Sequence, residues 1–240
     1  QEGSELITNG DFATDSNWIK GTGWSISGGI ATLDGTQVGS SGLGSSTMSV
    51  TSGKTYKVVV NVISKSSGFR LYDNNGVVAY GLNVGENVFY RTVTSSTYQV
   101  TPLGLSGATG SIDNVSVKEV GQDWTLGTGW SIGDGFVEAN NTSSFISQSG
   151  LIQASKLYRL TFEARLKSGT NGTIKAYIGG SNNQQFTIDS TNWQSFTYVN
   201  TRGGSNADSI YFNNNGTELE LDNISVIEII GDKPRIDYSD

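Results

Sequence analysis

Two short segments pair a long cationic side chain with a tyrosine two residues later: Arg70 with Tyr72, and Lys175 with Tyr177. In an extended strand, residues two apart share one face. A flat ring can pack against the C–H face of a sugar, while the neighbouring cation donates charge-assisted hydrogen bonds to hydroxyl groups. Tyr211 lies between two apolar residues and is expected on the same side of the second copy. The alternative to a sugar site is a solvated cation that lies over an exposed ring, a cation–π contact worth about 0.5–1 kcal/mol.

A second group of polar residues lies in two matching segments, Ile112–Val117 and Leu221–Val226. In both, the alternation of apolar residues slips by one position at an Asp-Asn pair, which predicts a β-bulge. Asp113 and Asp222 would then turn out of the pleat. They could simply accept hydrogen bonds from nearby backbone, or they could bind a structural Ca²⁺ together with backbone carbonyls and the opening segment around Asp11.

Most catalytic chemistry is excluded by two missing residue types, since the chain has no His and no Cys. Thiol nucleophiles, Ser-His-Asp triads and ordinary zinc sites all need one of them. A pair of carboxylates could still hydrolyse a glycoside, but the sequence singles out no such pair, so we expect no enzyme.

The charge balance and the hydropathy pattern exclude two partners. Fifteen Lys and Arg against 22 Asp and Glu give a net charge of −7, which is unsuited to a phosphate backbone, and nucleic acid is not expected as a partner. No apolar stretch reaches the roughly 18–20 residues that a membrane span needs. Membrane insertion is therefore not expected either.

Strands rather than helices are expected to position these residues. The segment Tyr158–Leu166 alternates strictly between apolar and polar residues, which is typical of a half-buried strand. Glycine is abundant, at 32 of 240 residues, and supplies the left-handed positions of tight turns. A strand is also expected at Leu6–Thr8. About seven or eight antiparallel strands per copy predict an all-β fold with two tandem β-sandwich, jelly-roll domains.

The chain is a tandem duplication, because the motif in Trp18–Thr36 returns in Trp124–Thr142. The predicted domains are residues 1–120 and 121–231, with 232–240 as a linker to a following domain. Four tryptophans recur at the same spacing and are expected in the cores: Trp18, Trp24, Trp124 and Trp130.

The second copy lacks the opening strand of the first. Residues 1–17 precede Trp18, whereas only residues 121–123 separate Val120 from Trp124. Either the second domain manages without that strand, or the tail at 234–238 or a neighbouring chain supplies it.

The segments Leu6–Phe12, Gly21–Gly29 and Ile112–Val117 together resemble carbohydrate-binding-module jelly rolls related to galactose-binding-like domains. More narrowly, they resemble the tandem versions in bacteriophage tail and fibre proteins. The resemblance implies a jelly roll, frequent calcium where the first and last strands meet, and sugar binding on a sheet face or at loop tips. The sequence departs from that pattern at Ala13, where the family often has an acidic residue.

The sequence therefore predicts a non-enzymatic glycan-binding and adhesion module of a phage virion protein, on the virion surface or extracellular. Its expected partners are a bacterial surface glycan and other virion proteins, and homo-oligomerisation is left open. The alternatives are a purely structural spacer or decoration domain of a virion, and an accessory module of a polysaccharide-degrading enzyme.

Overall fold

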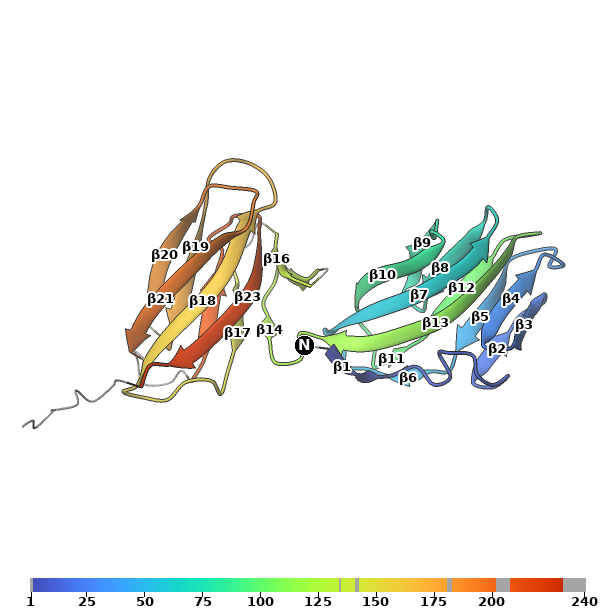
Figure 1. Ribbon diagram of the computed structural model, residues 1–240, viewed down its shortest axis with the longest axis horizontal. Coiled ribbons are helices and arrows are strands. Elements are labelled where there is room, and N and C mark those ends of the chain that lie inside the picture. Colours follow the sequence, from blue (N-terminus) through green and yellow to red (C-terminus); the bar gives the residue numbers. More distant parts are fainter. Residues whose placement is uncertain (1, 134, 141–142, 181–182, 202–207, 231–240) are drawn as a thin grey trace, which may run out of the picture. The chain divides into compact units, whose positions relative to one another are not determined.

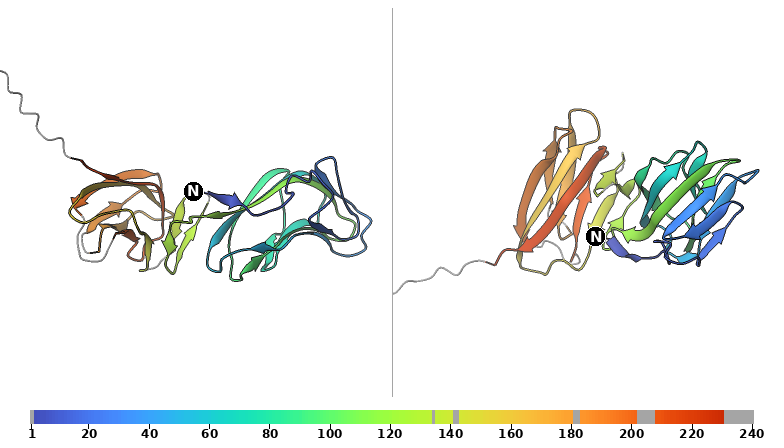
Figure 2. Two further views of the ribbon diagram at one scale, coloured as in Figure 1. Left: turned by 90° about the horizontal axis from the view of Figure 1, so that it is seen from below. Right: turned by 45° about the vertical axis from the view of Figure 1, so that its right-hand side comes forward.

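The computed structural model describes all residues except 1, 134, 141–142, 181–182, 202–207 and 231–240. The described residues form strands and turns without any helix, and therefore without a helix that could span a membrane. The chain divides into two compact units, Gln1–Gln122 and Asp123–Asp240 (Figure 1). Each unit is a β-sandwich of two layers (Figure 2). The expected all-β fold of two tandem sandwiches is confirmed, and the predicted linker at 232–240 lies outside the described residues.

The first unit packs two main sheets face to face. One has the order β10-β7-β13-β4-β3, with β1 added on β13, and the other has the order β2-β5-β12-β8-β9; β6 and β11 form a small separate pair. The strands are β1 (Glu2–Glu5), β2 (Trp18–Lys20), β3 (Trp24–Ser27), β4 (Ile30–Asp34), β5 (Ser41–Ser45), β6 (Met48–Ser49), β7 (Thr55–Lys65), β8 (Phe69–Asp73), β9 (Gly76–Ala79), β10 (Gly85–Thr92), β11 (Thr97–Tyr98), β12 (Val100–Gly104) and β13 (Thr109–Val120).

The second unit repeats this arrangement with sheet orders β15-β16-β23-β18-β21 and β14-β17-β22-β19-β20. Its strands are β14 (Thr125–Leu126), β15 (Trp130–Ile132), β16 (Val137–Ala139), β17 (Phe145–Gln148), β18 (Leu157–Leu166), β19 (Gly172–Ile178), β20 (Asn183–Ile188), β21 (Gln194–Thr201), β22 (Ile210–Asn213) and β23 (Leu219–Glu228).

The duplication extends to the hydrogen bonds that hold the cores. Tyr56 and Tyr158 occupy matching places on β7 and β18, and both rings are buried. The Tyr56 hydroxyl accepts from the amide of Thr51 at 2.9 Å, and the Tyr158 hydroxyl accepts from the amide of Gln153 at 2.8 Å. Positions can therefore be matched between the two units strand by strand.

The tryptophans follow the prediction with one exception. Trp18, Trp24 and Trp130 are 6–7% exposed and belong to the two cores, whereas Trp124 is only half-buried. The ring of Trp18 is covered by Phe12, with centroids 5.0 Å apart. No residue equivalent to Phe12 precedes Trp124, because the second copy lacks the opening segment.

The predicted bulge is present in both closing strands. The register of β13 against β7 shifts between Asp113 and Val115, and that of β23 against β18 shifts at the matching place. Asn114 and Asn223 adopt left-handed backbone conformations there, with φ of 50° and 49°. Asn tolerates this conformation better than most residues with a Cβ.

The opening strand lies earlier than expected. β1 spans Glu2–Glu5 and pairs antiparallel with the end of β13, whereas the segment predicted as a strand, Leu6–Thr8, is irregular. The carboxylate of Glu5 bonds the backbone here, because its Oε1 accepts from the amides of Leu6 and Ile7 at 3.1 and 3.0 Å. The amide of Leu6 also donates to the carbonyl of Val117 on β13 at 3.0 Å.

A buried polar network fixes the far end of β8, the strand that carries Arg70 and Tyr72. The side chain of Asp73 is 0% exposed and accepts from Arg91 Nε at 2.7 Å and from the hydroxyl of Tyr98 at 2.9 Å. The Asp73 carboxylate raises the pKa of Arg91, and burial followed by the charge of Asp73 raises the pKa of Tyr98.

Candidate functional site

Three aromatic rings lie together on the outward side of one sheet of the second unit. We call Phe145, Tyr177 and Tyr211 the aromatic face. Tyr177 pairs with Tyr211 across β19 and β22, and Phe145 comes from the neighbouring strand β17. The ring centroids are 5.9–6.5 Å apart, with interplanar angles of 69–82°. This edge-to-face packing holds the rings in fixed positions relative to one another.

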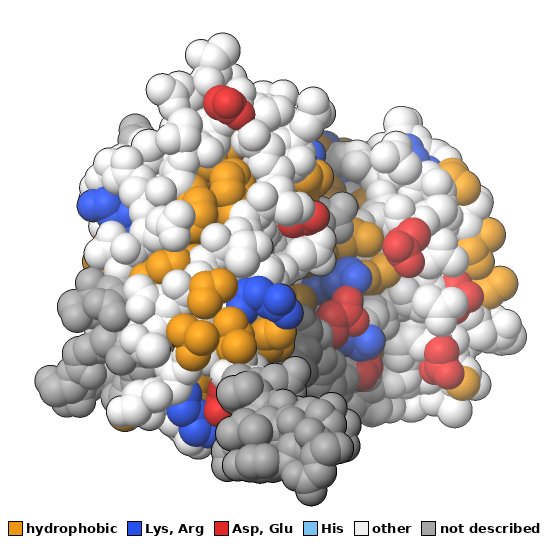
Figure 3. All heavy atoms as spheres, turned by 60° about the vertical axis from the view of Figure 1, so that its left-hand side comes forward, with side chains coloured by type: hydrophobic (Ala, Val, Ile, Leu, Met, Phe, Trp, Pro, Cys, Tyr) orange, Lys and Arg blue, Asp and Glu red, His pale blue; other side chains and the backbone are white. Residues whose placement is uncertain are grey.

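The aromatic face borders an open cavity of about 480 Å³. Phe145 is 46% exposed, which is unusual for a phenylalanine in a strand. On the face shown in Figure 3, hydrophobic side chains reach the surface in patches between backbone and other side chains. The residues lining the cavity are Thr125, Gly127, Ser144, Phe145, Ser147, Tyr177, Gly180 and Tyr211.

Polar side chains surround these rings because of the strand register. Lys175 lies two residues before Tyr177 on β19 and pairs with Asn213 on β22 and Gln185 on β20. Asn213 is buried, and its Nδ2 donates to the carbonyls of Ser143 and Ser144 at 2.7 and 3.2 Å, which fixes the start of β17. Lys175 is half-buried and Gln185 is exposed, so both stand beside the rings at the solvent surface.

The matching face of the first unit lacks one of these rings at Gly42. The amide of Gly127 donates to the carbonyl of Phe145 at 2.9 Å. In the first unit, the amide of Gly21 makes the same bond to the carbonyl of Gly42, also at 2.9 Å. Gly42 therefore occupies the position of Phe145 and provides no ring.

A second ring is missing at Thr101. Tyr72 pairs with Thr101 across β8 and β12, just as Tyr177 pairs with Tyr211 across β19 and β22. Of the three positions of the aromatic face, the first unit thus keeps an aromatic residue at Tyr72 alone.

The predicted pair Arg70 and Tyr72 is on one face of β8, but the cation is used differently. The guanidinium of Arg70 lies 5.2 Å from the ring centroid of Tyr80, which is 70% exposed, and its Nη1 is 3.5 Å from the Tyr72 hydroxyl. Arg70 Nε is buried and has no hydrogen-bond partner within the described part of the chain. This arrangement is a cation over an exposed ring rather than a set of clustered rings.

The structure thus brings Lys175, Tyr177 and Tyr211 together and adds Phe145, which the sequence analysis missed. Phe145 lies in the sequence Ser-Ser-Phe-Ile-Ser-Gln, where the buried residue is Ile146. The sequence does indicate an outward phenylalanine here, because the alternation of Phe145, Ile146 and Ser147 places Phe145 on the polar side of β17.

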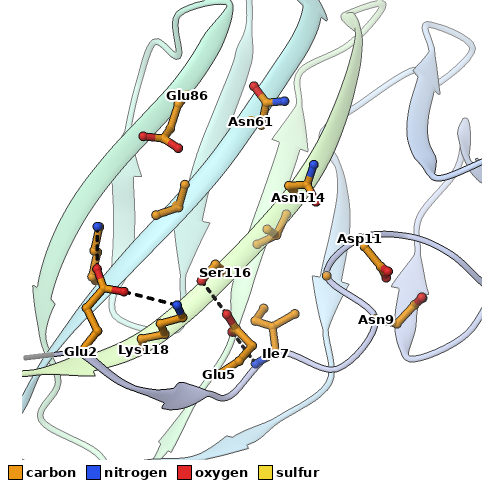
Figure 4. Close-up of a pocket in the computed structure, with 14 residues that line it drawn as sticks. Glu2, Glu5, Ile7, Asn9, Asp11, Asn61, Glu86, Asn114, Ser116 and Lys118 are labelled. Carbon is orange, nitrogen blue, oxygen red and sulfur yellow. Dashed lines mark hydrogen bonds and ion pairs between the residues drawn. The ribbon is translucent and has the colours of Figure 1, made fainter.

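A larger groove of about 810 Å³ lies on the first unit, between the opening segment and the outward face of β7, β10 and β13 (Figure 4). No aromatic ring lines it. The side chain of Glu2 bonds Lys57 and Lys118 at 2.7 and 3.2 Å, which lowers the pKa of Glu2. The remaining lining residues are Glu5, Ile7, Asn9, Gly10, Asp11, Val59, Asn61, Glu86, Asn114, Val115 and Ser116.

The three predicted calcium ligands accept hydrogen bonds from nearby backbone amides. Oδ1 of Asp113 and of Asp222 each accepts from the amide of the next residue at 2.7 Å, and Oδ1 of Asp11 accepts from the amide of Ala13 at 3.3 Å. Within the described ranges there is no group of three acidic, imidazole or thiol side chains that could hold a metal ion. A calcium ion here would need mostly carbonyl ligands, and its binding stays a prediction.

Comparisons with known proteins show no family and give only distant similarities to solved structures. No family model matches the chain, and no curated protein matches it. A solved structure similar to the chain is the tandem CBM22-1–CBM22-2 domain of Paenibacillus barcinonensis Xyn10C, with 10% identity, 95% of this chain and 98% of that chain covered, and a TM-score of 0.35. A structure described as CBM4 has 17% identity, covers 42% of this chain and 76% of that chain, and has a TM-score of 0.34. The cycloalternan-forming enzyme of Listeria monocytogenes, in complex with a pentasaccharide substrate, has 10% identity, 82% and 20% coverage, and a TM-score of 0.32. At TM-scores below 0.5, these similarities assign no ligand to this chain.

Proposed function

We propose that the chain is a non-enzymatic glycan-binding module and that the aromatic face of the second unit is its binding site. The observation that carries the proposal is the clustering of Phe145, Tyr177 and Tyr211 beside an open cavity of about 480 Å³. Sugars offer C–H faces to rings and hydroxyl groups to polar neighbours. Lys175, Gln185 and Thr125 stand beside the rings. Together they supply hydrogen-bond donors and acceptors.

The composition of this cavity favours binding over catalysis. A glycosidase needs two carboxyl groups flanking the scissile bond. The described residues that line the cavity are polar and uncharged, aromatic or glycine, and none carries a carboxyl group.

The biological setting follows from the sequence resemblance to modules of phage tail and fibre proteins. In that setting the chain is extracellular or on a virion surface, next to other virion proteins, and attaches to a bacterial surface glycan. An accessory module of a polysaccharide-degrading enzyme would use the same face. The sequence on either side of this chain distinguishes these two settings.

A bacterial-polysaccharide glycan array with the multimerised chain tests the proposal, followed by titration of each positive glycan. We expect weak binding, on the order of millimolar. Tyr177→Ala should weaken it at least about tenfold, the effect of about 1.4 kcal/mol, because it removes one of three mutually contacting rings.

Tyr72→Ala is the matched control, because it removes the equivalent ring from the first unit and should leave binding unchanged. Equal losses in Tyr72→Ala and Tyr177→Ala would refute the assignment to the second unit. Absence of binding by a folded, multimerised sample would favour the structural spacer instead.

A further inference from the structure

The closing strand of the second unit has an open edge that is covered in the first unit. β23 pairs with β18 along its length, but β16 covers its other edge only at Leu219–Leu221. Beyond the bulge, Ile224–Glu228 has no strand on that side among the described residues. In the first unit, β1 lies at this place and pairs with the end of β13.

The backbone groups of this edge point outward. The amide of Ile229 donates to the carbonyl of its direct partner Leu157 at 2.8 Å. Hydrogen-bonded and non-hydrogen-bonded pairs alternate along antiparallel strands. Glu228 and Val226 are therefore in non-hydrogen-bonded pairs with β18, and their N–H and C=O groups point away from it. Unpaired groups of this kind are a template for an added strand.

The first unit shows what such an edge binds. The carboxylate of Glu5 accepts from the amide of Val117 at 2.8 Å and from the hydroxyl of Ser116 at 2.6 Å (Figure 4). The amide of Leu6 then donates to the carbonyl of Val117 at 3.0 Å. An extended segment with a glutamate followed by an apolar residue thus satisfies both backbone groups of Val117.

The second unit keeps three of the four donor positions that bind Glu2 and Glu5 in the first unit, whereas Ile227 stands at the position of Lys118, which also binds Glu2. Ser225 and Val226 occupy the positions of Ser116 and Val117. Arg159 stands at the position of Lys57, which binds Glu2 in the first unit. Arg159 makes no ion pair with any residue that the structure describes. Its guanidinium can therefore form an ion pair with an acidic residue at the start of an incoming segment.

Apolar surface is also left uncovered. Val115 and Val117 are 3% and 0% exposed beneath the opening segment, where Ile7 is 8% exposed. Their counterparts Ile224 and Val226 are only half-buried. An incoming segment with apolar residues after its glutamate would bury both.

We propose that the edge at Ile224–Glu228 is a docking site for an extended peptide segment supplied from outside the two units. Its chemistry is that of the first opening segment: an acidic residue, then a glutamate three positions later, followed by two apolar residues. The segment adds an antiparallel strand to β23, its glutamate accepts from Val226 and Ser225, and its first acidic residue pairs with Arg159.

Amide hydrogen exchange of the full chain, with and without a synthetic peptide of residues 1–12, tests the proposal. In the free chain, the amide of Val117 should exchange slowly and those of Val226 and Glu228 rapidly. If the peptide binds with a Kd of about 0.1 mM, 1 mM peptide should slow the exchange at Val226 and Glu228 about tenfold. The exchange at Val117 should not change.

Three substitutions separate the specific contact from non-specific association. A peptide with Glu5→Gln and the Ser225→Ala chain should each bind several-fold more weakly. Val226→Pro removes the outward N–H without breaking a bond to β18, so this variant should fold and no longer bind. Unchanged exchange at Glu228 with 1 mM peptide would overturn the proposal. Protection that depends on protein concentration without peptide would also overturn it, because the occupant would then be a second copy.

Discussion

Replacing Tyr98 with phenylalanine removes one hydroxyl from the buried network around Asp73 and has an effect that reverses with pH. Tyr98 is 0% exposed, and its hydroxyl donates to Asp73 Oδ2 at 2.9 Å. A hydrogen bond to a charged acceptor contributes about 1.5–3 kcal/mol. At pH 8 the first unit of Tyr98→Phe should therefore be less stable by about 2 kcal/mol.

The reversal follows from the raised pKa of Tyr98 in the folded chain. A raised pKa contributes stability below the unfolded value of about 10 and loses it as pH rises further. Above pH 10, unfolded Tyr98 releases its proton while folded Tyr98 keeps it, which costs the natural chain about 1.4 kcal/mol per pH unit. Phenylalanine has no such cost. The unfolding free energies of the natural chain and of Tyr98→Phe should therefore become equal at about pH 11.5. At that pH, the loss accumulated by the natural chain over about 1.5 pH units cancels its advantage of about 2 kcal/mol.

Urea unfolding followed by fluorine NMR of 5-fluorotryptophan-labelled protein measures each unit separately. Trp18 and Trp24 report the first unit, while Trp124, Trp130 and Trp193 report the second and serve as an internal control. A stability difference that stays the same from pH 8 to pH 11 would refute the reasoning, since Tyr98 would then ionise as readily folded as unfolded.

Two further predictions concern the segments that differ or recur between the units. Phe12→Ala should destabilise the first unit by about 3–5 kcal/mol, because the ring is 1% exposed and covers Trp18. If the first unit of this variant unfolded at the same urea concentration as in the natural chain, in the same fluorine NMR assay, the prediction would be contradicted. Asn114→Ala should cost the first unit about 1–2 kcal/mol because φ is 50° there, and Asn114→Gly should recover most of that loss in thermal unfolding, which would fail if the Asn114 side chain rather than its backbone were important.

Local sequence patterns were sufficient for strands such as β18 and for the bulges, but not for β1. The alternation in Tyr158–Leu166 places its apolar residues in the core, as expected from a period of two. The slip at Asp113 and Asn114 appears as a register shift for the same reason. In both cases the information lies within about ten neighbouring residues.

Features that depend on distant partners could not be predicted in this way. The position of β1 depends on contacts between Glu5 and the end of β13, more than a hundred residues away. The aromatic face depends on the register of β17 against β22, which brings Phe145 beside Tyr211. The sequence places Tyr177 and Tyr211 on one face, but no local pattern connects either of them to Phe145.

The replacement of two rings by Gly42 and Thr101 determines the valence of the chain. If the aromatic face binds a glycan, a chain with two similar sandwiches is monovalent, and the duplication does not add a second arm for the same ligand. Weak single-site binding then becomes strong attachment only where several chains are displayed together, since avidity depends on the number of linked sites. The avidity of an assembly for a surface would then depend on the spacing and number of its chains rather than on the repeat within each chain.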